Sequence, residues 1–165
     1  MSQKYVVFES MTYGIFPVIL SEITNHGDIA KCFRDEFNCR PTSAGYCNAQ
    51  GQVWGNSSSL KLKSQEDDSV FIEKTLKDPK YLTLAVPGGI TEVLIFPSML
   101  DHKKVLDAIH THYPGLEVQG AGFISLANGV NPRGKSVSLD KGPAPDDKFY
   151  LERMLGEVSF GGPGD

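Results

Sequence analysis

The sequence predicts an α+β fold in which two tandem ββαββα repeats are related by a pseudo-twofold axis, with antiparallel sheets and helices packed on one face. One observation behind this is a duplicated motif: Gly-x-Ser-x-Ser-Leu at residues 55–60 recurs at residues 134–139. An Asp-Asp pair at 67–68 recurs at 146–147, again at an offset of 79 residues. The other observation is hydrophobic periodicity, which switches between strand-like and helix-like in the same order in both copies.

Further matches extend the repeat towards the N-terminus. His26 matches His102 at an offset of 76, and Gly45 matches Gly122 at an offset of 77. Two copies with a long period indicate a pseudo-symmetric pair, because a solenoid needs about three units or more. We therefore divide the chain into repeat 1 (1–78), repeat 2 (79–157) and a flexible Gly-rich tail (158–165). A unit this short buries little core alone, so we expect both repeats to form one compact unit, as a fused dimer would.

The elements follow from residue type and spacing. Runs of β-branched and aromatic residues predict strands, and apolar residues at helical spacing predict helices, with Asn25 and Asp101 as helix N-caps. In repeat 1 we expect strands at 4–9, 15–23, 42–49 and 52–60 and helices at 26–37 and 64–77. In repeat 2 we expect strands at 81–86, 91–96, 116–126 and 131–139 and helices at 102–113 and 145–155.

Composition excludes several classes of function. The 165 residues carry a net charge of −4, which is the wrong sign for a protein that binds duplex nucleic acid. No apolar run approaches the roughly 18 residues of a membrane span, and the first residues lack the apolar core of a signal peptide. The cysteines (Cys32, Cys39 and Cys47) all lie in repeat 1 and lack metal-ligand spacing. We expect a cytoplasmic protein without metal or cofactor, and homo-oligomerisation is left open.

The duplicated serines are the main candidates for ligand binding. Ser57 and Ser59 alternate on a predicted strand, so both hydroxyls should share one face, and Ser136 and Ser138 should do the same. Paired hydroxyls next to a glycine and ahead of a helix N-terminus suit an anion or a polar small molecule. The alternative is a solvent-facing edge of an antiparallel sheet.

Basic residues flank the serine strands. The candidates are Arg40, Arg133, Lys135 and Lys141, with Lys61 and Lys63 beyond the first strand. An arginine among them could hold a phosphate group through two parallel hydrogen bonds. The alternative is a solvated basic face.

Histidines and aspartates at helix starts are secondary candidates: His26, His102, Asp67 and Asp146. Negative charge in a first helical turn is favoured by the helix dipole, and that structural interpretation competes with a paired-carboxylate catalytic or metal site. Such a site needs a further ligand that the sequence does not supply. Two-histidine phosphoesterases need His-x-Thr or His-x-Ser in each lobe, and neither histidine is followed by that pattern.

Two glycines lie inside predicted strands, where glycine weakens a sheet. Gly45 and Gly122 indicate a bulge or the close approach of a partner strand or ligand, and close packing near the pseudo-symmetry axis is the favoured interpretation.

The repeated pattern resembles a group of small phage and bacterial proteins that carry one copy of it. The residues concerned in repeat 2 are Phe96-Pro97, His102, Ala121-Gly122-Phe123, the 134–139 motif and Asp146. Repeat 1 departs from the pattern with Leu20-Ser21 in place of Phe-Pro and Tyr46 in place of Phe. The resemblance implies a small cytoplasmic accessory protein encoded by a phage, and it brings no catalytic assignment.

The functional expectation is a non-catalytic protein that binds a small anionic ligand. A phosphorylated molecule, such as a nucleotide or a cyclic nucleotide immune signal, would be sequestered and released unchanged. One alternative is a hydrolase that uses the repeated aspartates and histidines. Another is a protein–protein interaction or inhibitor module. The absence of a complete catalytic constellation favours binding.

Overall fold

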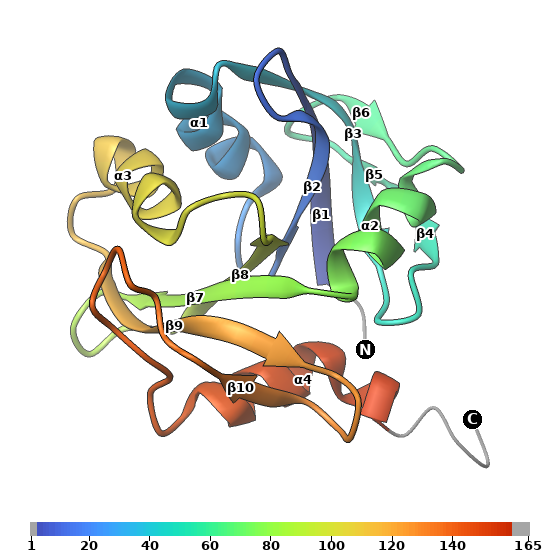
Figure 1. The fold of residues 1–165 in the computed structure, drawn as a ribbon. Helices are drawn as coiled ribbons and strands as arrows, with labels where there is room; N and C mark the ends of the chain where they lie inside the picture. The colour runs from blue at the N-terminus through green and yellow to red at the C-terminus, as the bar shows by residue number, and fades with distance from the viewer. Residues whose placement is uncertain (1–2, 160–165) are drawn as a thin grey trace.

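The computed structural model describes residues 3–159 and has a mixed α+β fold (Figure 1). The first half of the chain forms β1 (Gln3–Ser10), β2 (Gly14–Leu20), α1 (His26–Phe37), β3 (Cys39–Cys47), β4 (Val53–Trp54), β5 (Asn56–Ser57), β6 (Leu62–Lys63) and α2 (Asp68–Leu76). The second half forms β7 (Pro79–Ala85), β8 (Glu92–Pro97), α3 (His102–His112), β9 (Glu117–Ser125), β10 (Asn131–Arg133) and α4 (Asp147–Ser159).

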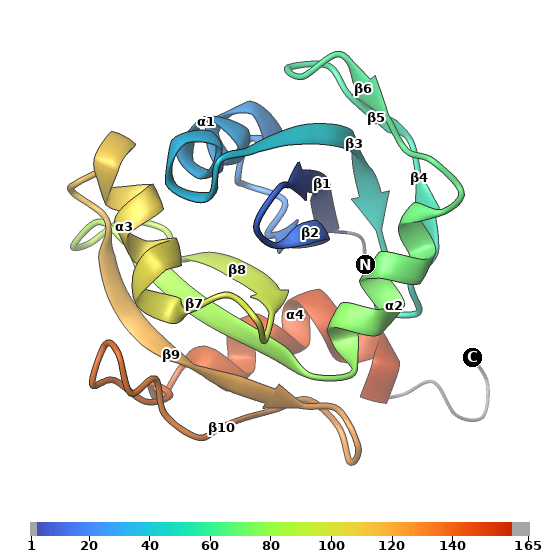
Figure 2. The ribbon, with the colours of Figure 1, turned by 45° about the horizontal axis from the view of Figure 1, so that its top comes forward.

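Eight of these strands form one antiparallel sheet in the order β10-β9-β7-β8-β2-β1-β3-β4. Strands β2 and β8 join the two halves of the chain at the centre of the sheet, where Ile19 faces Ile95 and Leu20 faces Leu94. Figure 2 shows that the strands of the two halves run at a steep angle to one another, so the sheet is strongly twisted. Strands β5 and β6 form a separate small hairpin.

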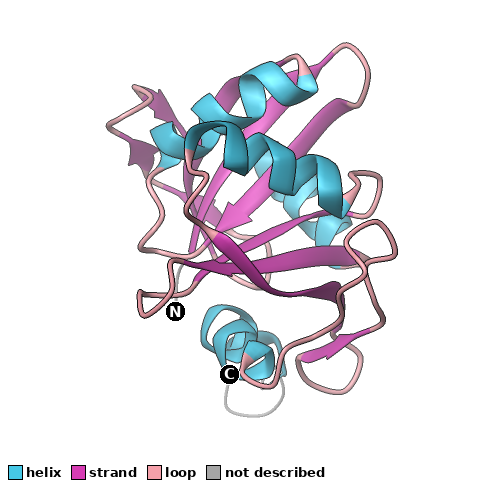
Figure 3. Ribbon diagram, turned by 90° about the vertical axis from the view of Figure 1, so that its left-hand side faces the viewer, coloured by secondary structure: helices cyan, strands magenta, loops and turns pink. Residues whose placement is uncertain are grey.

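The helices cover both faces of the sheet, and the prediction that they pack on one face is wrong (Figure 3). Helices α1 and α3 pack against each other and over one face, whose core includes Val6 and Phe8. Helices α2 and α4 cover the opposite face, whose core includes Tyr5 and Val7. These four consecutive residues of β1 are each at most 2% exposed, as expected for a strand buried on both sides.

The predicted helix N-caps are confirmed. The side chain of Asn25 accepts hydrogen bonds from the backbone N–H groups of Gly27 and Asp28, and Asp101 accepts the same bonds from Lys103 and Lys104. Each cap satisfies helix N–H groups that have no partner within the helix. The caps therefore fix where α1 and α3 begin, and a histidine is the first residue of each helix.

The predicted strands at 52–60 and 131–139 are confirmed only in their first part, as β4 and β10, because the chain leaves the sheet partway along each segment. Gly55 and Gly134 adopt positive φ angles of 76° and 73°, which glycine accepts without steric cost. Beyond these glycines come tight turns, and Lys61 (φ 56°) and Asp140 (φ 52°) occupy the left-handed region as well. The serines therefore lie in folded-back loops rather than on long strands.

The C-terminal helix is longer than predicted. Helix α4 ends at Ser159, so it includes the first two residues of the predicted tail at 158–165. Residues 160–165 lie outside the described residues. No helix among residues 3–159 is both long enough and apolar enough to cross a membrane.

Candidate functional site

The serine loops (residues 55–60 and 134–139) are held by their own hydroxyl groups. Ser57 is only 2% exposed, and its Oγ accepts a hydrogen bond from the Leu60 N–H at 3.2 Å. The Ser57 and Ser59 hydroxyls lie 3.3 Å apart, so they meet across a turn and not along a strand face. In the second loop Ser136 accepts from the Leu139 N–H at 3.2 Å. Its hydroxyl lies 3.4 Å from that of Ser138.

Each serine loop is tied to a helix that precedes it in the chain. The Ser59 hydroxyl accepts from the Gly27 N–H at the start of α1, at 3.1 Å. The Ser138 hydroxyl accepts from the Lys103 N–H at the start of α3, at 3.3 Å. From the sequence, we expected these serines to act together with the N-termini of the helices that follow them, α2 and α4. At the starts of α1 and α3, the first N–H groups are bonded to these serines and to the cap side chains.

His26 and His102 connect the same helix starts to the sheet. The Nε2 atom of His26 lies 2.9 Å from the Gly45 carbonyl oxygen, and that of His102 lies 2.9 Å from the Gly122 carbonyl oxygen. Both imidazoles are about 4% exposed or less. Burial lowers the pKa of each from its ordinary value of 6.5. A neutral imidazole can donate to only one acceptor, and here Nε2–H donates to the backbone.

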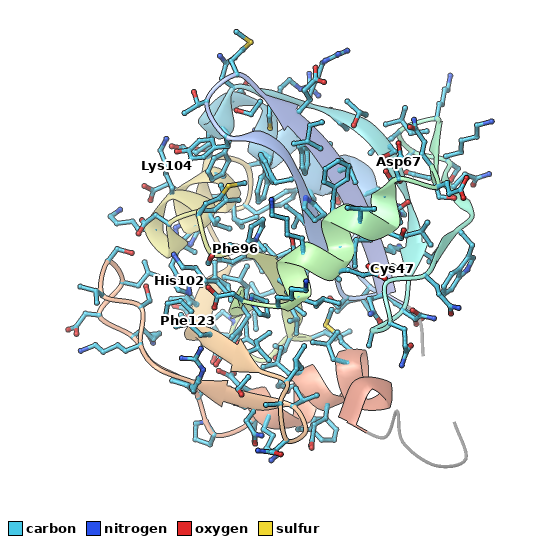
Figure 4. The ribbon with its side chains drawn as sticks, turned by 45° about the vertical axis from the view of Figure 1, so that its right-hand side comes forward. Cys47, Asp67, Phe96, His102, Lys104 and Phe123 are labelled. Carbon is cyan, nitrogen blue, oxygen red and sulfur yellow. The ribbon has the colours of Figure 1, made fainter. Side chains whose placement is uncertain are left out.

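Aromatic rings enclose both imidazoles. His26 meets Tyr46 edge-on, and His102 lies between Phe96 and Phe123, with ring centroids 5.6 Å and 5.8 Å away (Figure 4). These rings account for the desolvation that lowers the two pKa values. The geometry therefore gives the histidines a role in joining helix to sheet.

The glycines that accept from the histidines lie against a neighbouring strand. A Cβ atom at Gly45 would lie 2.5 Å from the Trp54 carbonyl oxygen, and one at Gly122 would lie 2.7 Å from the Arg133 carbonyl oxygen. No side chain fits at these distances without moving the backbone. The contacts agree with close packing at both glycines, but the expected place near the pseudo-symmetry axis is wrong, because β3 and β9 pack against the edge strands β4 and β10 and not at the centre of the sheet.

A buried carboxylate lies at the start of α2. Asp68 is 3% exposed. Its oxygens accept hydrogen bonds from the Tyr5 hydroxyl at 2.5 Å, the Ser43 hydroxyl at 2.7 Å and the Gln65 N–H at 2.9 Å. The bonds connect α2 to strands β1 and β3. Burial, followed by the contact with Asp68, raises the pKa of Tyr5 above its usual value, so the hydroxyl stays protonated and donates.

The start of α4 carries the same arrangement. Asp147 is 1% exposed and accepts from the Tyr81 hydroxyl at 2.6 Å, the Thr83 hydroxyl at 2.9 Å and the Ala144 N–H at 2.8 Å. Burial and the contact with Asp147 likewise raise the pKa of Tyr81. The second aspartate of each Asp-Asp pair is therefore the buried one, whereas the candidates Asp67 and Asp146 are exposed. Tyr5 and Tyr81 match at the same offset as the histidines, which marks the tyrosines as a repeated feature but does not select between the two aspartates.

The hydroxyl group that completes each carboxylate site comes from a different strand in the two halves. Val7 faces Ser43 in the first half, and Thr83 faces Gly120 in the second. Ser43 on β3 donates to Asp68, whereas Thr83 on β7 donates to Asp147. A Cβ atom at Gly120 would lie 2.0 Å from an Asp147 oxygen, so this position cannot carry a serine as well. Each facing pair therefore supplies one hydroxyl.

The basic candidates do not converge on one site. Arg40 on β3 pairs with Glu9 at 2.9 Å on an exposed surface. Lys135 pairs with Asp140 at 2.6 Å, and this contact lowers the pKa of the Asp140 carboxyl. The Arg133 guanidinium lies 5.6 Å from the centre of the Phe123 ring, and the Lys141 Nζ lies 3.4 Å from a backbone oxygen of β9. Strands β3 and β10 stand near opposite edges of the sheet, which separates Arg40 from the other three.

A groove of about 530 Å³ lies beside the first serine loop. Its polar lining comprises Thr42, Asn56, Ser57, Ser58, Lys61, Lys63 and Gln65. Neither Lys61 nor Lys63 forms an ion pair within residues 3–159. At the offset of 79 residues, Asp140 and Gly142 take the places of these lysines, so the second loop lacks this pair of charges. Sequence reasoning noted both lysines but did not select them, since nothing in the pattern marks which lysines line a groove.

The metal-ligating and thiol groups of residues 3–159 form no further site. No three His, Cys, Asp or Glu side chains in the described part of the chain gather closely enough to hold a metal ion. The three cysteines are buried free thiols whose pKa values are raised by burial, to about 11 for Cys32 and about 12 for Cys39 and Cys47. No protein family model, curated protein or solved structure matches the chain.

Exchanging the hydroxyl between facing strands tests the carboxylate site. We expect Ser43→Gly to destabilise the protein by about 1–3 kcal/mol, because a buried Asp68 oxygen loses its donor. The double variant Val7→Thr/Ser43→Gly should recover most of this loss by copying the Thr83–Gly120 pair. Val7→Thr alone serves as the control and should not stabilise, because Ser43 already donates. Denaturant unfolding measures all three, and a double variant no more stable than Ser43→Gly would contradict the assignment.

The buried histidines predict a loss of stability in acid. Their folded-state pKa values lie below 6.5, so the unfolded chain binds more protons as the pH falls past that value. The contribution of the two histidines to the free energy of unfolding should be constant above about pH 7.5 and should fall from about pH 6.5 downwards. For each full unit by which folding lowers a histidine pKa, the protein should lose about 1.4 kcal/mol of unfolding free energy in acid.

Glutamine variants isolate this effect, since the amide keeps a donor and does not titrate. His26→Gln and His102→Gln should each reduce the slope of stability against pH, and the double variant should reduce it further. Urea unfolding at a series of pH values provides the measurement. Slopes equal to that of the unmodified protein would show that other groups cause the acid dependence.

Proposed function

We propose that the protein is a non-catalytic binding protein for a phosphorylated small molecule, with the groove beside the first serine loop as its site. The observation that carries this proposal is the pair of lysines, Lys61 and Lys63, which have no ion pair among the described residues and share a groove with exposed hydroxyl and amide groups. Phosphate oxygens accept strong hydrogen bonds from such cations. The volume of about 530 Å³ is in the range of small-ligand sites.

A binding role is favoured over hydrolysis by the way the reactive groups are used. The buried carboxylates each accept three hydrogen bonds from the protein, and both imidazoles donate to backbone carbonyls. A general base must reach the proton that it removes, and these groups are enclosed. A nucleotide or cyclic nucleotide that is held and released unchanged fits this arrangement, and sequestration of an immune signal for a phage is the role that the sequence resemblance favours.

We also propose that the fold arose by duplication of a ββαββα unit, with the two copies related by a pseudo-twofold axis between β2 and β8. The near-constant sequence offsets support this, as does the strand order, in which β2-β1-β3-β4 on one side corresponds to β8-β7-β9-β10 on the other. The paired histidine, serine and carboxylate contacts add support. The arrangement is that of a fused ancestral dimer.

Ligand binding can be tested by calorimetry with mono-, di- and cyclic nucleotides. Removing one charged hydrogen bond costs about 1.5–3 kcal/mol, so Lys63→Gln and Lys61→Gln should each weaken binding roughly tenfold or more. Lys135→Gln is the matched control, because that lysine already pairs with Asp140 and should leave the affinity unchanged. Mass analysis of the recovered ligand should show it intact. Absence of binding, or a cleaved ligand, would refute the proposed function.

The duplication predicts how a half-length chain behaves. A fragment of residues 1–78 loses the β2–β8 pairing and the packing of α1 on α3, so it should be unfolded or should dimerise through β2. Circular dichroism and analytical ultracentrifugation distinguish these outcomes from a folded monomer. A stable monomeric fragment would count against the fused-dimer origin.

A further inference from the structure

Two pockets lie at opposite ends of the central strand pair, on the face covered by α2 and α4. The α2 pocket has a volume of about 570 Å³ and lies between α2, the start of β2 and the loop after β8. The α4 pocket has a volume of about 200 Å³ and lies between α4, the start of β8 and the loop after β2. Because β2 and β8 are antiparallel, the start of one strand lies beside the end of the other. Each pocket therefore combines residues from both halves of the chain.

The two pockets are lined by matched positions. The offsets of 76 and 79 residues that relate the serine loops and histidines also relate the pocket linings. Ile15, Pro17, Phe71, Lys74, Thr75 and Met99 line the α2 pocket. Thr91, Val93, Tyr150, Arg153, Met154 and Ile23 line the α4 pocket at the matching positions. Under the proposed duplication the two pockets are therefore equivalent sites.

Two kinds of side chain, an aromatic ring and a cation, occur at matching positions in both pockets. An aromatic ring (Phe71 or Tyr150) is followed three residues later by a cation (Lys74 or Arg153), so both project from one side of the helix. Neither cation forms an ion pair within residues 3–159. This pairing of an apolar surface with one positive charge suits a ligand that has an apolar body and an anionic end.

Exposed apolar side chains stand at both pocket mouths. Met99 is 50% exposed at the α2 pocket, and Ile23 is 54% exposed at the α4 pocket. One exposed apolar residue is ordinary, but apolar surface kept at matched positions around a concave site is typical of ligand contact. These side chains would cover the apolar body of a bound molecule.

The charge balance limits what can bind. Besides its cation, each pocket has one carboxylate in its lining, Asp78 in the α2 pocket and Glu22 in the α4 pocket. A single cation beside a carboxylate cannot neutralise a polyphosphate. These pockets therefore differ from the groove beside the first serine loop, which is lined by Lys61 and Lys63 (the lysine groove). A ligand with one negative charge is the best match.

We infer that each pocket binds one small carboxylic acid, held by its cation and packed against its aromatic ring. The ligands differ in size, because Met154 in the α4 pocket stands where the smaller Thr75 stands in the α2 pocket. The α2 pocket takes an aromatic acid, and the α4 pocket takes a short branched aliphatic acid. This inference goes beyond the proposed function and uses none of the residues of the lysine groove.

The test is an NMR titration of the full-length protein with phenylacetate and with isovalerate. Phenylacetate should shift the amide signals of residues 71–75, and isovalerate those of residues 150–154. Lys74→Gln should weaken phenylacetate about tenfold and leave isovalerate unchanged, and Arg153→Gln should do the reverse. Thr75→Met should weaken phenylacetate by filling the α2 pocket. Lys63→Gln should change neither affinity, which separates this test from the nucleotide test of the lysine groove.

The neutral amides of the two acids provide a comparison that needs no variant. Phenylacetamide and isovaleramide should bind the unmodified protein about tenfold more weakly than the acids, because they carry no charge for Lys74 or Arg153. Amides that bind as tightly as the acids would overturn the inference. So would shifts that spread over the whole surface, or acids that bind Lys74→Gln and Arg153→Gln as tightly as the unmodified protein.

Discussion

The buried carboxylates of Asp68 and Asp147 are the constraint on which the arrangement of layers depends. An ionisable group in an apolar interior is costly unless hydrogen bonds replace its water, and each of these receives three. The donors come from the first strand of each half and from the loop before the helix, and in the first half also from β3. Each set of bonds is therefore complete only when its helix, α2 or α4, starts at a fixed position over the sheet. These two positions put α2 and α4 on the face of the sheet opposite α1 and α3.

Much of the fold could be predicted from the sequence. Helix caps follow local rules, and Asn25 and Asp101 bond as those rules require. The α+β class also follows from periodicity. The burial of β1 on both faces was missed because a short apolar run does not show how many of its sides are covered. The serine loops were missed because Gly55 turns the chain out of the sheet, and a glycine in a strand-like pattern does not reveal its φ angle.

The candidate site was harder to predict than the fold. An Asp-Asp pair at a helix start offers two positions one residue apart, and only tertiary contact with Tyr5 selects Asp68 over Asp67. The serines were rightly singled out as a repeated feature, but their hydroxyls bond to the protein's own helices. Grooves and pockets are assembled from distant segments, so the lysine groove, the α2 pocket and the α4 pocket leave no local pattern in the sequence.

The proposed duplication provides a way to separate structural residues from binding residues. A feature that is kept in both halves and buried, such as the histidine–glycine contact, is explained by stability. A feature present in one half alone, such as the Lys61–Lys63 pair, is not required by the shared fold, and the proposed binding site rests on this pair. A feature kept in both halves yet exposed is the most informative. Burial does not explain Lys74 and Arg153 or the apolar side chains near them, and their recurrence is the observation from which we infer contact with a ligand.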